Sequence, residues 1–85
     1  MKIYTVLCIS RDLDNPQVVV SNFINLDDAK QQFDYYEDED RAAFKIVAED
    51  VGDFEALNTV LGHFTALDQN TEEKIEEVFL IETEE

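Results

Sequence analysis

The sequence predicts an α+β domain in which a small antiparallel or mixed three-stranded sheet carries two or three helices on one face. Segments of alternating or β-branched apolar residues lie near both ends of the chain, and segments with helical spacing lie between them. The length of 85 residues suits one domain. We therefore treat residues 1–85 as a single acidic globular domain.

The predicted strands lie near residues 2–10, 17–23 and 77–83. In the first, apolar residues such as Ile3 and Val6 fall on both sides of the strand, which indicates a central position in the sheet. Turn-forming residues at 11–16 separate it from the β-branched second strand, so these two are expected to form a hairpin. The apolar run 78–81 predicts a buried third strand.

The predicted helices cover about residues 26–36 and 53–63. Asn25 is a candidate N-cap for the first, and Phe33 lies on its apolar face. Residues 41–51 fit either a third helix or a strand. The alanines and glutamate in this segment and a stop at Gly52 favour the helix.

The core prediction follows from the apolar faces of these elements. The residues expected to be buried are Ile3, Leu7, Phe33, Leu57, Leu61, Phe64 and Leu80.

Charge is the most unusual property of the chain, because 21 acidic residues stand against 6 basic ones and give a net charge of −15. Such a field disfavours contact with nucleic acids and anionic membranes and favours capture of a basic protein surface. Nine aromatic residues indicate that the charge lies on a folded surface rather than on a disordered tail. No cationic leader or membrane-length apolar run is visible, so we expect a cytoplasmic protein.

Candidate catalytic and metal-binding residues are few, and we expect no enzyme, cofactor or dedicated metal site. Cys8 is a lone cysteine in a predicted strand, and His63 is the only histidine. A Cys8–His63 pair has no local support in the sequence. Acidic segments beginning at Asp12 and Asp34 resemble calcium-binding loops, but neither has the required Gly at position 6 or Glu at position 12.

The acidic residues are concentrated in two segments. Seven lie between Asp27 and Asp40, and eight lie between Asp68 and Glu85. On a helix, acids three or four residues apart form a ladder, and we expect the first segment to face water and bind a partner, with Tyr35 as an anchor. The candidate partner-binding residues are Asp34, Tyr35, Glu37, Asp38, Glu39 and Asp40, with Glu82, Glu84 and Glu85 as a second choice.

In size, acidity, low cysteine content and layout, the chain resembles the small inhibitors of host defence that phages and mobile elements encode, such as DNA-mimic anti-restriction and anti-CRISPR proteins. The resemblance involves no shared motif. It implies a polyanion mimic that binds the nucleic-acid-binding surface of a basic host protein, in the host cytoplasm if the protein is phage-encoded. The alternative is an acidic interaction module that regulates a basic partner, such as a polymerase or assembly factor, without mimicry.

Self-repulsion at a net charge of −15 predicts a stability that depends on salt. Raising sodium chloride from 0.01 to 0.1 M shortens the Debye length from about 30 to about 10 Å. We therefore expect the melting temperature, measured by circular dichroism, to rise across this range. A flat or falling trend would show that neighbouring charges already compensate one another.

Overall fold

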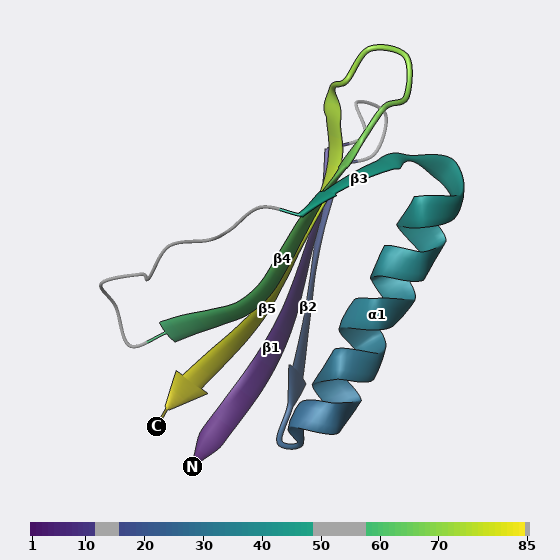
Figure 1. The fold of residues 1–85 in the computed structure, drawn as a ribbon. Helices are drawn as coiled ribbons and strands as arrows, with labels where there is room; N and C mark the ends of the chain where they lie inside the picture. Colours follow the sequence, from purple (N-terminus) through teal and green to yellow (C-terminus); the bar gives the residue numbers. More distant parts are fainter. Residues whose placement is uncertain (12–15, 49–57, 85) are drawn as a thin grey trace.

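The computed structural model describes residues 1–11, 16–48 and 58–84. Its elements are β1 (Lys2–Ser10), β2 (Gln17–Phe23), α1 (Leu26–Ala43), β3 (Lys45–Ala48), β4 (Asn58–Leu67) and β5 (Lys74–Glu84). The strands form one antiparallel sheet in the order β2-β1-β5-β4-β3. Figure 1 shows α1 along one face of this sheet. We call this face the helix face and the opposite one the distal face.

The fold is α+β, but the predicted three-stranded sheet with two or three helices is wrong, because the described residues form five strands and one helix. The strands predicted at 2–10 and 17–23 are confirmed, and they pair with each other along their whole length. The third predicted strand lies inside the longer β5, which pairs with β1. β1 is therefore internal to the sheet, as its apolar faces indicate.

The helix predicted at 53–63 is also wrong, because the chain from Asn58 to Leu67 is β4; residues 53–57 lie outside the described residues. The pairing of β4 with β5 shifts between Val60 and Gly62, so Leu61 is an extra residue in the strand. This bulge interrupts the alternation of a regular strand. It leaves apolar residues spaced three and four apart, which resembles the stripe of an amphipathic helix.

The ambiguous segment 41–51 divides between the two interpretations. α1 was predicted to end at residue 36 but runs on to Ala43. The helix interpretation of segment 41–51 is therefore correct for residues 41–43. Phe44 is extended and ends the helix, while its N–H donates to the Asp40 carbonyl at 2.7 Å. Lys45–Ala48 then pairs with β4, as the strand alternative implies. Residues 49–51 lie outside the described residues.

The core lies between α1 and the sheet. Its most buried large members are Val6, Phe64 and Val78, each no more than 2% exposed. The core prediction is confirmed for Phe64 and Leu80. Ile3, Leu7 and Phe33 are only half-buried, Leu61 is 43% exposed, and Leu57 lies outside the described residues. The two β1 residues were misassigned because α1 covers the Tyr4–Val6–Cys8 side of that strand instead.

Close contact between α1 and the sheet depends on a glycine. A Cβ atom at Gly62 would lie 3.1 Å from Cζ of Phe33. The absence of a side chain therefore lets the Phe33 ring reach the sheet, where it packs edge-on against Phe64 with ring centroids 5.4 Å apart. This contact fixes the rotation of α1 about its own axis.

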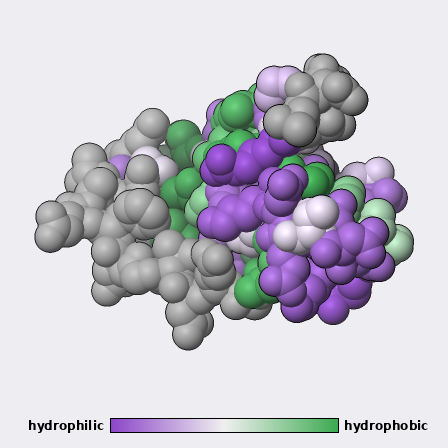
Figure 2. Space-filling view, turned by 90° about the horizontal axis from the view of Figure 1, so that it is seen from above, coloured by the Kyte–Doolittle hydropathy of each residue, from purple (hydrophilic) through white to green (hydrophobic). Residues whose placement is uncertain are grey.

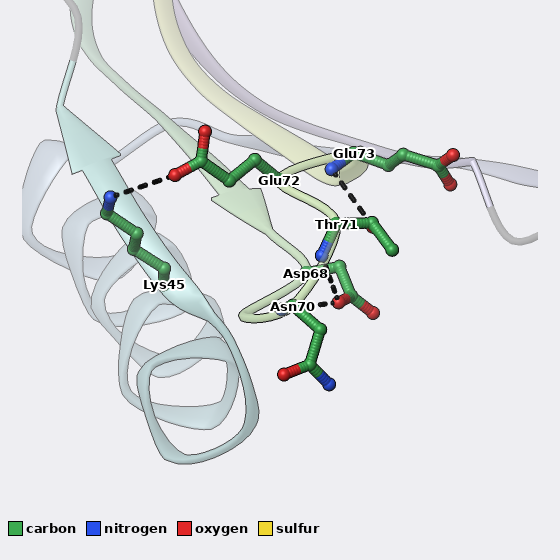
Figure 3. Close-up of polar contacts among 6 residues, drawn as sticks. All are labelled: Lys45, Asp68, Asn70, Thr71, Glu72 and Glu73. Atoms are coloured by element: carbon green, nitrogen blue, oxygen red, sulfur yellow. Dashed lines mark hydrogen bonds and ion pairs between the residues drawn. The ribbon is translucent and has the colours of Figure 1, made fainter.

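The turn between β4 and β5 is held by polar contacts (Figure 3). The Asp68 carboxylate accepts hydrogen bonds from the backbone N–H groups of Asn70 at 2.8 Å and Thr71 at 3.0 Å. These bonds keep the pKa of Asp68 below its ordinary value. Glu72 adopts a left-handed conformation, with φ of 60°, and its carboxylate lies 3.7 Å from the Lys45 ammonium. The turn is thereby linked to the edge strand β3.

Replacing Gly62 with valine tests the helix–sheet contact. The new methyl groups would overlap the Phe33 ring, and we expect the free energy of unfolding in urea to fall by about 1–3 kcal/mol. The control is Leu61→Val at the neighbouring exposed position, which should change it by less than about 0.5 kcal/mol. Equal stability of Gly62→Val and the parent would contradict the packing of Phe33 over this glycine.

Candidate partner-binding surface

α1 begins at a capped end that favours acidic residues. The side chain of Asn25 accepts a hydrogen bond from the Asp27 N–H at 2.8 Å, so the predicted N-cap is confirmed. Asp27 and Asp28 occupy the first turn, where the helix dipole stabilises negative charge. The helix can therefore carry acids from its first turn onward.

Helical periodicity divides the residues of α1 between the sheet and the solvent. Ala29, Phe33, Tyr36 and Asp40 are spaced by four, three and four residues, so they share the side that packs on the sheet. This side includes a carboxylate, because Asp40 is only 7% exposed. The remaining acids of the predicted cluster are distributed over the flanks and the outer side.

Three exposed acids in the second half of α1, Asp34, Asp38 and Glu39, are called the outer acids; Asp34 and Asp38 lie on the outer side together with the exposed Asp27, and Glu39 lies on a flank. Asp34 and Asp38 are one turn apart, so their Cβ atoms are about 5–6 Å from each other. Tyr35 stands beside them and is 57% exposed, with its ring edge-on to Tyr36 at 6.0 Å. Figure 2 shows hydrophilic residues gathered on the side of the molecule where α1 lies.

Cations compensate acids elsewhere on the molecule. Among the described residues, five of the six basic side chains form ion pairs, and their carboxylate partners are Glu37, Glu72, Glu77 and Glu82. Within the described part of the chain, no ion pair involves an outer acid. Glu37, by contrast, lies on the flank of α1 and binds Arg41 one turn later. The sixth basic residue, Lys30, is exposed on α1 one turn before Asp34, and among the described residues no ion pair joins it to an outer acid.

The second predicted cluster lies away from the outer acids. Glu82 is half-buried and pairs with Lys2 at 3.0 Å, whereas Glu84 is exposed near the end of β5. Glu85 lies outside the described residues. Figure 1 shows this end of β5 at the opposite end of the molecule from the last turns of α1. The two clusters thus do not form one surface.

Asp40 departs from the prediction that the whole run 37–40 faces water. The expectation placed these acids in a turn, but α1 continues through them and directs Asp40 inward. Burial, together with neighbouring Glu76 and Glu39, raises the pKa of the Asp40 carboxyl to about 7. The buried Oδ2 atom of Asp40 has no hydrogen-bond donor, so the neutral carboxyl is favoured over the carboxylate at this position.

Cys8 lies close to this acid pair. Burial and the nearby carboxylate of Glu76 raise the pKa of the Cys8 thiol to about 12, so the reactive thiolate is disfavoured. His63 lies on β4 and stacks on Phe79 with ring centroids 4.2 Å apart. The strand register places Cys8 on the helix face and His63 on the distal face, so the two do not form a catalytic pair.

The acid pair was missed in the sequence, although a signal for it exists. The apolar spacing of Ala29, Phe33 and Tyr36 extends to Asp40 if the helix is continued by one more turn. Glu76 is in an alternating strand beside apolar residues, which gives no comparable signal. Its approach to Asp40 depends on how the helix lies over the sheet.

Comparisons with known proteins add no family assignment. The chain matches no protein-family model, and no curated protein or solved structure is significantly similar to it. Among the described helices, none has the length and apolar character needed to cross a membrane.

The raised pKa of Asp40 predicts that stability falls as pH rises. Between the ordinary pKa of 3.8 and about 7, the unfolded chain releases this proton while the folded chain keeps it, so folding becomes less favourable. Below this window both states hold the proton, and above it both have lost it. Asp40→Asn removes the effect, so its stability relative to the parent should increase from pH 4 to 7, by at most about 1.4 kcal/mol for each pH unit.

Urea denaturation at several pH values measures this difference. The matched control is Asp38→Asn, which removes the same charge from the outer side of α1 and leaves the buried pair in place. A constant difference between Asp40→Asn and the parent across pH 4–7 would show that Asp40 ionises freely in the folded protein.

Proposed function

We propose that this protein is a non-enzymatic inhibitor that binds the nucleic-acid-binding surface of a basic protein, with the outer acids of α1 imitating a polyanion. The observation that supports this proposal best is the distribution of ion pairs over the molecule. Five basic side chains pair with acids of the sheet, the turn and the helix flank, while among the described residues the outer acids are exposed and form no ion pair, even with Lys30 one turn before Asp34.

The geometry of a helix gives these charges a fixed spacing. α1 rises about 1.5 Å per residue, so the acids from Asp27 to Glu39 extend over about 18 Å of a rigid rod. Duplex DNA also presents negative charge at regular intervals along a rigid axis. Because the helix fixes the backbone positions of these acids before binding, no backbone ordering is needed when a partner docks.

Tyr35 adds an uncharged contact to this surface. Its ring is exposed beside the outer acids and is steadied by Tyr36. Tyrosine is enriched at energetically important positions of interfaces, because it brings a large area and a hydrogen-bonding group together. We place the protein in the cytoplasm, and in that of the host cell if a phage encodes it, because nucleic-acid-binding targets are found there.

A capture experiment with a charge-matched control tests this proposal. The parent, the triple variant Asp34→Asn/Asp38→Asn/Glu39→Gln, and the control Glu72→Gln/Glu73→Gln/Glu84→Gln are immobilised and exposed to bacterial lysate. Each triple variant removes three exposed carboxylates. We expect the helix variant to retain at least about tenfold less of the captured protein, and the control to behave like the parent, because encounter depends on the local field.

Elution separates mimicry from ordinary acidic binding. Short duplex DNA or RNA should release the captured protein if it shares a binding surface with nucleic acid. If salt releases the captured protein but nucleic acid does not, the protein is an acidic interaction module without mimicry. If both triple variants capture as much as the parent, the outer acids are not the binding surface.

A further inference from the structure

The distal face of the sheet is apolar, although the chain as a whole is acidic. Register places Val20, Leu7, Phe79 and His63 in one row across four strands. The adjacent rows add further isoleucine and valine side chains. None of the described helices or strands covers this face, since α1 lies on the other one (Figure 1).

Exposure differs between equivalent positions of the two faces. On the helix face, Val6 and Val78 are at most 1% exposed. On the distal face of the same strands, Leu7 and Phe79 are only half-buried, and on β2 the distal Val20 is 56% exposed against 42% for the helix-face Val19. The distal face is closed at Thr65 and Glu77, which are 1% and 8% exposed. An apolar face of this kind is unfavourable in water and is typical of a surface that meets another protein.

The distal face is also nearly free of uncompensated charge. Its one carboxylate among the described strand positions is Glu77, which binds Arg11 and Lys74, each at 3.3 Å. Burial by itself would raise the pKa of Glu77, but these two cations lower it below its ordinary value. A shallow depression elsewhere on the face is lined by uncharged side chains, namely Ile3, Thr5, Asn22 and Thr83.

The chemistry of this face favours a second copy of the chain as its partner. A basic protein would find no free carboxylate among the described strand positions of this face, whereas an identical apolar face is complementary to it. In a face-to-face pair the two α1 helices would lie on opposite outer sides. That arrangement separates the acidic surfaces of two molecules that each carry a net charge of −15.

The size of the face is sufficient for a dimer. Five strands about 4.8 Å apart, with the central ones 9 to 11 residues long, cover an area of about 24 by 30 Å. Pairing two such faces removes at most on the order of 1,400 Å² from water, because β2 and β3 are shorter and Thr65 and Glu77 are already buried; this upper bound is at the lower end of the range of about 1,200–2,000 Å² for stable interfaces. Packed sheets of this kind stand about 10 Å apart.

We propose that the protein forms a symmetric homodimer by packing the distal faces of two copies against each other. The proposal does not depend on the function of the outer acids, which remain exposed on both sides of such a dimer. It also predicts an opposite response to salt. Screening of the mutual repulsion strengthens the dimer, whereas it weakens binding of a basic partner.

Sedimentation equilibrium of the purified chain in 0.5 M sodium chloride tests the proposal. A mass of twice 9.8 kDa is expected at micromolar concentration, with a larger dissociation constant at 0.05 M salt. The double variant Val18→Lys/Val20→Lys places charge on the distal face and should be monomeric. The control Gln17→Lys/Val19→Lys adds the same charge to the same strand on the helix face and should remain dimeric.

Several outcomes would overturn this assignment. A 9.8 kDa species at all concentrations up to about 1 mM would do so. If both double variants are monomeric, the dimer contact lies at the β2 edge and not on the distal face. If both are dimeric, the contact does not involve the distal side of β2. If the distal-face lysines prevent folding, as judged by circular dichroism, Val18→Thr/Val20→Thr replaces them. It should raise the dissociation constant at least about tenfold, and no change would contradict the proposal.

Discussion

The packing of α1 on the sheet is the contact on which the other features depend. It is the one helix among the described elements, and it meets the sheet where Gly62 lets the Phe33 ring approach β4. The rotation that this contact fixes carries Ala29 and Asp40 inward and Asp34 and Asp38 outward. An interaction between two apolar groups thereby decides which acids can meet a partner and which one is desolvated.

The same packing separates the molecule into surfaces of different chemistry. The outer acids of α1 form no described ion pair, while the distal face is apolar and the one carboxylate at its described strand positions, Glu77, is neutralised by two cations. An acidic chain gains from this separation, because repulsion between copies and attraction to basic proteins then act at different places. The proposed dimer and the proposed mimicry use these two surfaces independently.

The sequence predicts the first hairpin and the start of the first helix well, because Lys2–Ser10 and Gln17–Phe23 have a clear strand pattern and Asn25 is a strong cap. The sequence wrongly predicts a helix at β4, because the bulge at Leu61 changes the alternating spacing of apolar residues into a spacing typical of a helix. The exposure of Asp34 and Asp38 could be predicted from their spacing on the helix. The inward position of Asp40 could not, since it requires both the true end of α1 and the contact with Glu76.

The titration of the Asp40 side chain tests most directly whether α1 has this rotation. Carbon-13 NMR of the labelled protein follows each aspartate carboxyl as pH changes, and Asp40→Asn identifies the signal. With Asp40 buried beside Glu76, its midpoint should lie near 7. A midpoint at the ordinary value of 3.8 would mean that Asp40 faces water, and the division of acids between the two sides of α1 would then be wrong.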